Sequence, residues 1–136
     1  RYTYENIIER KAFTVNVPSA AQVKIADYCG IVSGRNEDKF ARAGITAVKA
    51  DFVDAPYIKE FPMALECKLS SITDVGIHTH LIGEIMDVKV EESMLDNDGM
   101  PDIHKINPII YAPEIQGYFG VGEFLGRAFA IGKEIK

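Results

Sequence analysis

The sequence contains few cysteines, and this excludes two classes of small protein. Cys29 and Cys67 are the only two, which is too few for a disulfide scaffold, and their spacing lacks the close pairs of a structural zinc site. We therefore expect free thiols. Cys67 alternates with Leu65 and Leu69, so we expect it in the core. Cys29 lies near the end of an expected helix, where it could contact a cofactor.

The sequence also lacks a long apolar run and an excess of positive charge. No segment is long enough to cross a bilayer, and Arg1–Glu9 has no signal-peptide core. The 20 acidic and 15 basic residues give a formal net charge of -5, which argues against binding to nucleic acid or an anionic membrane surface. We expect a cytoplasmic protein with neither of these partners.

The length and the apolar content favour one domain over residues 1–136. A chain of 136 residues with 47% hydrophobic side chains can bury a core of its own. The chain begins with Arg1 rather than Met, on a segment that already has helical periodicity. We therefore expect either a processed protein or a fragment of a longer one.

The first 40 residues show short helical and strand patterns. The spacing predicts a helix over Thr3–Arg10 with Thr3 as its cap, then a strand over Phe13–Val17. A second helix is expected from Ser19 to about Gly30, followed by a polar loop over Ser33–Asp38. Short helices of this kind are expected to pack beside a sheet.

The rest of the chain has the period of β-structure. Alternation predicts a strand over residues 63–70, with its odd-numbered residues on the core side and Glu66 and Lys68 on the other. A long strand is expected over His78–Val90, and Asp96–Gly99 is a strong turn signal. Shorter apolar runs follow at residues 109–111, 118–119 and 126–131. The pattern predicts a mainly β fold, a β-barrel or open sheet with flanking helices.

Five segments, taken in order, resemble the flavin reductase-like family. They are Arg1–Ile7, Ala12–Pro18, Ser33–Phe40, Leu65–Leu69 and Gly76–Glu84. The resemblance implies an FMN-binding split barrel of the flavoredoxin or ferric reductase type, usually a homodimer with flavin near the subunit interface. It implies electron transfer from NAD(P)H or a redox partner protein through FMN to flavin, iron or a protein. The family's N-terminal section would precede Arg1, so the resemblance implies an incomplete domain.

The resemblance also implies where FMN binds. The family holds the FMN phosphate on the segment before its first helix, which corresponds to Arg1, Tyr2 and Thr3. A helix N-terminus offers unpaired backbone N–H groups, and a hydroxyl and a guanidinium add donors to phosphate. From the residues alone, the N-cap is the favoured interpretation of Thr3, and the resemblance reverses this preference. Lys39, in the family-like Ser33–Phe40 segment, is a second candidate ligand, against the alternative of a solvated helix face.

His78 is the one candidate catalytic residue. It matches a position where relatives carry a histidine near flavin and nicotinamide, and an imidazole there could hydrogen-bond a carbonyl or move a proton; otherwise it is a surface residue. A competing interpretation groups His78, His80 and Glu84 on one strand face as ligands of iron or manganese, as in the first cupin motif. Three functions thus stay open: a flavin reductase, a flavoredoxin-like electron carrier and a cupin-like metal enzyme.

Overall fold

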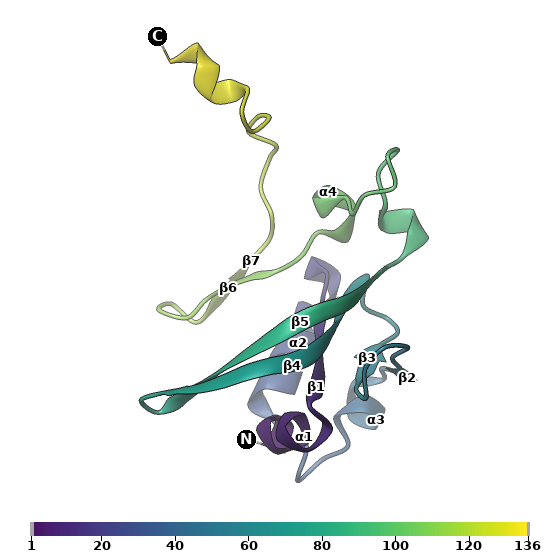
Figure 1. The fold of residues 1–136 in the computed structure, drawn as a ribbon. Coiled ribbons are helices and arrows are strands. Elements are labelled where there is room, and N and C mark those ends of the chain that lie inside the picture. The colour runs from purple at the N-terminus through teal and green to yellow at the C-terminus, as the bar shows by residue number, and fades with distance from the viewer. Residues whose placement is uncertain (1, 136) are drawn as a thin grey trace.

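The structure is a computed structural model that describes residues 2–135, so Arg1 lies outside the described residues. Short helices and antiparallel strands alternate along the chain (Figure 1). In order they are α1 (Tyr2–Arg10), β1 (Ala12–Val17), η1 (Ala20–Gln22), α2 (Val23–Ile31), α3 (Lys39–Ala43), β2 (Ala47–Lys49), β3 (Pro56–Ile58), β4 (Met63–Val75), β5 (His78–Val90), η2 (Glu92–Met94), α4 (Ile103–Ile106), β6 (Ile110–Ala112), β7 (Gly117–Phe119) and η3 (Ile131–Glu134).

A three-stranded antiparallel sheet in the order β1-β4-β5 forms the centre of the fold. β1 pairs with β4 so that Ala12 lies opposite Lys68, and β4 pairs with β5 so that Met63 lies opposite Val90. A tight turn joins the two long strands, with Gly76 at φ +60°, a conformation that glycine adopts without steric cost. The strands predicted over Phe13–Val17 and His78–Val90 are thus confirmed.

Two bulges interrupt the β4–β5 pairing, one on each strand. Met86 is an extra residue on β5, because the partners of Glu66 and Cys67 are not adjacent in sequence. Ser70 is the extra residue on β4, where it has no directly opposed partner. Bulges of this kind bend a strand and increase its twist, and Figure 1 shows the hairpin extending well beyond β1.

The front helices begin and end close to the predicted positions, but Thr3, predicted as the cap of the first helix, lies within α1. Ile7 is the buried residue of α1, and Lys11 ends the helix by donating its N–H to the Ile7 carbonyl at 2.8 Å. The second helix begins as a short 3₁₀ turn after Ser19 and continues as α2. α3 begins directly after the predicted polar loop, because the Asp38 carboxylate caps it by accepting from the Ala41 N–H at 3.1 Å.

The β2–β3 hairpin, which the sequence pattern did not indicate, lies beside β1. Asn16 accepts a hydrogen bond from the Ile58 N–H at 2.8 Å, and Thr14 donates to the Pro56 carbonyl at 2.6 Å. The loop that joins β2 to β3 covers one face of β4, and this explains an error in the prediction. Glu66, expected on the exposed side, has an exposed fraction of 0%.

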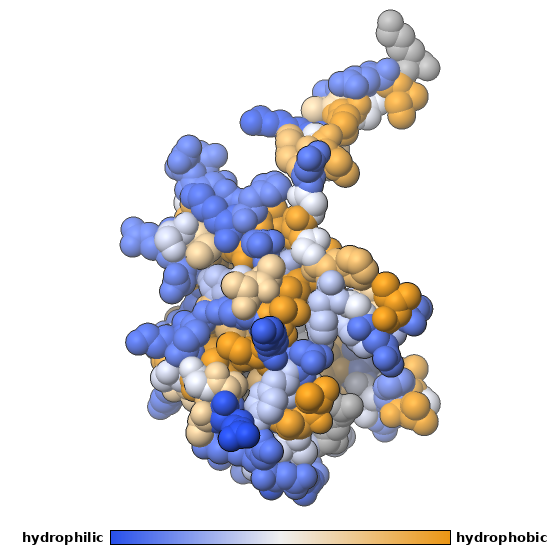
Figure 2. Space-filling model, turned by 180° about the vertical axis from the view of Figure 1, so that it is seen from behind, coloured by the Kyte–Doolittle hydropathy of each residue, from blue (hydrophilic) through white to orange (hydrophobic). Residues whose placement is uncertain are grey.

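The segment after β5 carries many apolar side chains in contact with solvent. The predicted turn at Asp96–Gly99 is confirmed, since the Asp96 carboxylate accepts the Met100 N–H at 2.8 Å. Beyond β7 the chain leads away from the sheet (Figure 1), and Figure 2 shows apolar side chains along this segment. Among the most exposed are Phe124, Leu125, Phe129 and Ile135. Within residues 2–135, no helix is both long and apolar enough to cross a membrane.

Candidate functional site

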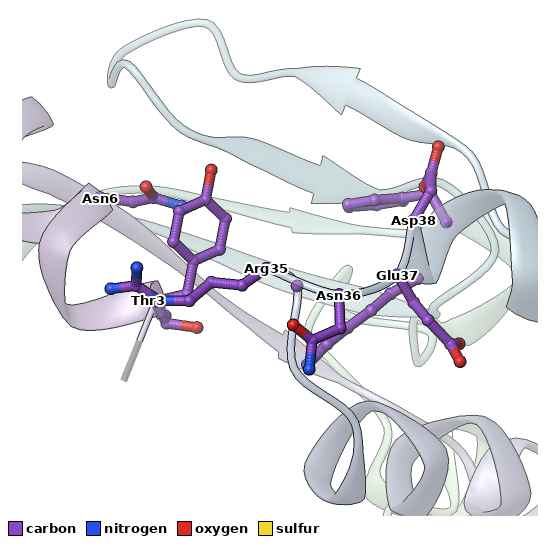
Figure 3. Close-up of a pocket in the computed structure, with 10 residues that line it drawn as sticks. Thr3, Asn6, Arg35, Asn36, Glu37 and Asp38 are labelled. Atoms are coloured by element: carbon purple, nitrogen blue, oxygen red, sulfur yellow. The ribbon is translucent and has the colours of Figure 1, made fainter.

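Two adjoining hollows surround the start of α1. The larger one, of about 550 Å³, lies between the first turn of α1 and the loop at residues 34–40 (Figure 3). The smaller one, of about 300 Å³, lies between the same turn and residues 29–35. Both hollows are lined by Tyr2, Thr3, Gly34, Arg35 and Lys39. The two spaces therefore meet at the first turn of the helix.

The structure brings together four of the residues predicted to bind the cofactor. Tyr2, Thr3 and Lys39 line both hollows, and Cys29 lines the smaller one. They come from three elements, α1, α2 and α3, that are up to 37 residues apart in sequence. Arg1, the fifth predicted residue, lies outside the described residues. The proximity of the other four is an observation, and their role in binding stays a prediction.

Lys39 occupies a defined position at the bottom of the smaller hollow. Its ammonium donates a hydrogen bond to the Cys29 carbonyl oxygen at 2.6 Å, in a partly buried contact. A neutral carbonyl leaves the positive charge of the ammonium unbalanced. An ammonium has three donors, so one bond to a carbonyl leaves two that could bind an anion in the hollow. Lys39 is therefore positioned as an anion ligand.

Close packing of a loop against the helix forms the wall between the hollows. Gly34 lies against the Tyr2 ring, where an added Cβ would be 3.1 Å from Tyr2 Cδ1. The Arg35 guanidinium lies over the same ring, 5.5 Å from its centre, and also pairs with the Glu5 carboxylate. A guanidinium over an aromatic face is attracted by the ring quadrupole. These contacts fix the loop relative to the first turn of α1.

The larger hollow also has polar groups that the sequence analysis did not single out. Asn6 and Asn36 contribute amide groups to its lining. Glu37 lines it too, and it accepts a hydrogen bond from the Tyr28 hydroxyl. That hydrogen bond to a carboxylate is the main cause that raises the pKa of Tyr28. These residues lie in the family-like segments Arg1–Ile7 and Ser33–Phe40, but only the three-dimensional arrangement shows that their side chains line one hollow.

His78 lies elsewhere in the molecule. It is the first residue of β5, next to the exposed turn of the hairpin, and it lines neither hollow. The structure therefore does not bring the predicted catalytic residue together with the predicted cofactor-binding residues. A catalytic role for His78 stays a prediction without geometric support from the described residues.

The metal-binding alternative fails on geometry. His78, His80 and Glu84 share strand parity, but they lie on one extended strand. A strand rises about 3.3 Å per residue, so the first and last of the three are roughly 20 Å apart. Within the described part of the chain, no three His, Cys, Asp or Glu side chains are grouped closely enough to hold a metal ion.

Comparisons with known proteins agree on one family. A family model described as "Flavin reductase like domain" matches residues 1–115. The solved structure of flavoredoxin from Desulfovibrio vulgaris (Miyazaki F) is 57% identical, with a TM-score of 0.91 over 96% of this chain and 70% of that chain. Flavoredoxin from Methanosarcina acetivorans is 34% identical, with a TM-score of 0.92 over 100% of this chain and 72% of that chain.

A curated relative is longer than the region of similarity. An uncharacterized protein of Archaeoglobus fulgidus is 36% identical over 76% of this chain. The chain spans 58% of that relative's length. The family model, which covers residues 1–115, includes the first turn of α1, the loop at residues 34–40 and the β4–β5 hairpin.

Proposed function

Because the chain belongs to the flavin reductase-like family, with the predicted split-barrel fold confirmed by its match to flavoredoxin structures, we propose that it binds FMN and transfers electrons through it. One observation carries the proposal. Tyr2 and Thr3, two of the residues that the resemblance assigns to the FMN phosphate, line two hollows that meet at the first turn of α1.

The groups at this turn suit a phosphate. The first turn of an α-helix has backbone N–H groups without intrahelical partners, and its dipole favours an anion. The Thr3 hydroxyl can donate to a phosphate oxygen, and Lys39 contributes a positive charge whose observed partner is a carbonyl. Cys29, beside Lys39 in the smaller hollow, contacts the bound group in this proposal. The donor set therefore fits the phosphate end of FMN.

The protein's part in the reaction is to bind and orient the cofactor. Bound FMN supplies the redox chemistry, because it can accept a hydride or single electrons. Thr3, Lys39 and the first turn of α1 would fix the phosphate end. Tyr2 and the loop at residues 34–40 would form the adjoining wall and limit water. In this proposal no side chain of the site needs to accept an electron.

Two versions of this function differ in the electron donor. As a flavin or ferric reductase, the protein would oxidise NAD(P)H in steady state and reduce flavin or iron. As an electron carrier, it would exchange electrons with a redox partner protein and turn over NAD(P)H slowly. The matches to two flavoredoxins, 57% and 34% identical, favour the carrier. Steady-state NAD(P)H oxidation with ferric iron as acceptor separates the two versions.

A homodimer is part of the proposal. Several apolar side chains of the β4–β5 hairpin are exposed in the single chain, among them Ile77, which is 96% exposed, and Val75, Ile82 and Ile85. Contiguous exposed apolar surface is typical of protein interfaces, and a second copy of the chain is the partner that the family resemblance implies. Light scattering of the purified protein tests this part of the proposal.

The first test is to add FMN, desalt the protein and record its visible absorption spectrum. Retained flavin absorbance supports the proposal, and loss of all flavin on desalting, together with no fluorescence change on titration, contradicts it. In Thr3→Ala, FMN should bind about tenfold more weakly, because a hydrogen bond to a charged group is lost. Riboflavin, which has no phosphate, should bind equally to both proteins. Thr73→Ala, in the exposed part of β4, is the matched control.

A further inference from the structure

Arg35 lies where the two hollows meet, but its charge is already balanced. Figure 3 shows its side chain extending from the loop toward Thr3 at the start of α1. Its guanidinium lies 5.5 Å from the centre of the Tyr2 ring and pairs with the Glu5 carboxylate. Lys39 differs, because the partner that the structure gives its ammonium is the Cys29 carbonyl. An anion must therefore displace a carboxylate to bind Arg35, whereas Lys39 can bind an anion without losing an ion pair.

The Arg35–Glu5 pair is one that an anion can replace. The exposed fractions of the two side chains are 54% and 55%, so both charges are largely hydrated. Exposed ion pairs of this kind contribute little free energy. A phosphate presents more acceptor oxygens to a guanidinium than a carboxylate, and it can bind it in a bidentate manner. Exchange of Glu5 for phosphate is therefore favourable without disturbing a buried group.

Glu5 opposes an anion in a second way. It lies in the first turn of α1, where its own negative charge interacts with the positive end of the helix dipole. A phosphate at Tyr2 and Thr3 would use the same end of the dipole. Glu5 thus reduces both the local positive potential and the number of free donors on Arg35.

We propose that Glu5 is a residue that sets the affinity of the site, by competing with the phosphate group of the ligand for Arg35. This inference rests on the proposed function and deepens it. In the structure, Arg35 is held beside the hollow by Tyr2 and Glu5. When a phosphate group enters, Arg35 keeps its place over the ring and exchanges the Glu5 carboxylate for phosphate oxygens. Glu5 makes binding weaker than the cationic residues alone would allow.

The test measures the FMN and riboflavin affinities of wild type and four variants by quenching of flavin fluorescence. Glu5→Gln should bind FMN about fivefold more tightly than wild type, because it removes the carboxylate that competes for Arg35. Arg35→Gln should bind FMN about tenfold more weakly, because it removes the guanidinium that would bind the phosphate. Riboflavin should bind equally to both. The double variant should bind FMN only slightly more tightly than Arg35→Gln alone, since Glu5 then has no guanidinium to occupy and only its effect on the helix dipole is removed. Glu9→Gln removes the same charge from the exposed last turn of α1 and is the control.

Each outcome decides between the alternatives. Tighter FMN binding in Glu5→Gln but not in Glu9→Gln, with most of the gain lost when Arg35 is also replaced, supports competition. Equal tightening in both glutamate variants would show a general charge effect and overturn the inference. Weaker binding of both flavins in Glu5→Gln would show that the pair only maintains the loop, and would also overturn it. Wild type that binds neither flavin would instead reject the proposed function.

Discussion

Replacing Lys89 with methionine would leave a buried carboxylate without its cation. Glu66, on the central strand β4, is fully buried, and its oxygens accept the Asp51 N–H at 3.2 Å and the Phe52 N–H at 2.8 Å. The Lys89 ammonium lies 3.2 Å from Glu66 Oε1. In Lys89→Met, both backbone hydrogen bonds remain, but the negative charge no longer has a nearby positive partner.

The expected cost follows from the burial of the two partners. Removing one partner of a buried ion pair costs about 3–5 kcal/mol of unfolding free energy. The Lys89 side chain is 23% exposed, so water can replace part of its effect, and we expect a value near the lower end, about 3 kcal/mol. For a domain of this size, that corresponds to a fall in Tm on the order of 10 °C.

Urea unfolding followed by circular dichroism is the assay, because the chain has no tryptophan to report by fluorescence. Lys49→Met, on the exposed strand β2, is the matched control and should change stability by less than about 0.5 kcal/mol. The double variant Glu66→Gln with Lys89→Met should recover part of the loss, because the buried charge is then absent, although the glutamine NH2 cannot accept one of the two backbone N–H groups. The argument would be refuted if Lys89→Met were as stable as the control, or if the double variant recovered nothing.

The same network gives a sign for the pH dependence. Hydrogen bonds to Asp51 and Asp87, with a further contribution from Glu66, raise the pKa of Lys89. A lysine pKa that is higher in the folded state contributes stability below its ordinary value, and this is lost as the pH rises through the raised pKa. Wild type should therefore lose stability at strongly alkaline pH more steeply than Lys89→Met.

Two further predictions concern local structure. Gly83→Ala should lower the free energy of unfolding by about 1–3 kcal/mol, because the added Cβ would lie 2.5 Å from Phe13 Cζ. Gly30→Ala is the control in urea unfolding, because its added Cβ would meet nothing within 4 Å. Equal stabilities of the two variants would contradict the prediction. Hydrogen bonds from the Lys105 and His104 N–H groups lower the pKa of Asp102, the cap of α4. The stability that this cap contributes is therefore fully present above the ordinary aspartate pKa and is lost as the pH falls through the lowered pKa. Carboxyl NMR titration measures that pKa, and a midpoint in the ordinary aspartate range would contradict the second prediction.

The sequence allowed much of the framework to be predicted, where patterns were long enough. The alternation in residues 63–70 and His78–Val90 covers many periods, so both strands were predicted. β2 and β3 have three residues each, which is too short for a period to be detected. Glu66 was misplaced because alternation gives the face of a residue and not what covers that face. A loop distant in sequence covers it here.

The candidate site could be predicted only in part. Neither periodicity nor spacing links Thr3 with Lys39; the resemblance to a family placed Thr3 at the phosphate and made Lys39 a candidate ligand. The pairing of Arg35 with Glu5 depends on the position of a loop relative to a helix, which a single sequence does not specify. His78 lies outside the two hollows although it belongs to a family-like segment, so its catalytic role stays a prediction.

The two bulges of the β4–β5 hairpin constrain how this hairpin can change in evolution. Met86 adds one residue to β5 and Ser70 adds one to β4, so the two strands have equal length and the register at both ends of the hairpin is the same. Deleting one of these residues alone would remove its bulge and leave the remaining pairs in place, because neither residue has a directly opposed partner. The bend and the added twist at that point would be lost. In relatives, a one-residue gap at either position should therefore preserve the strand pairing and straighten the hairpin.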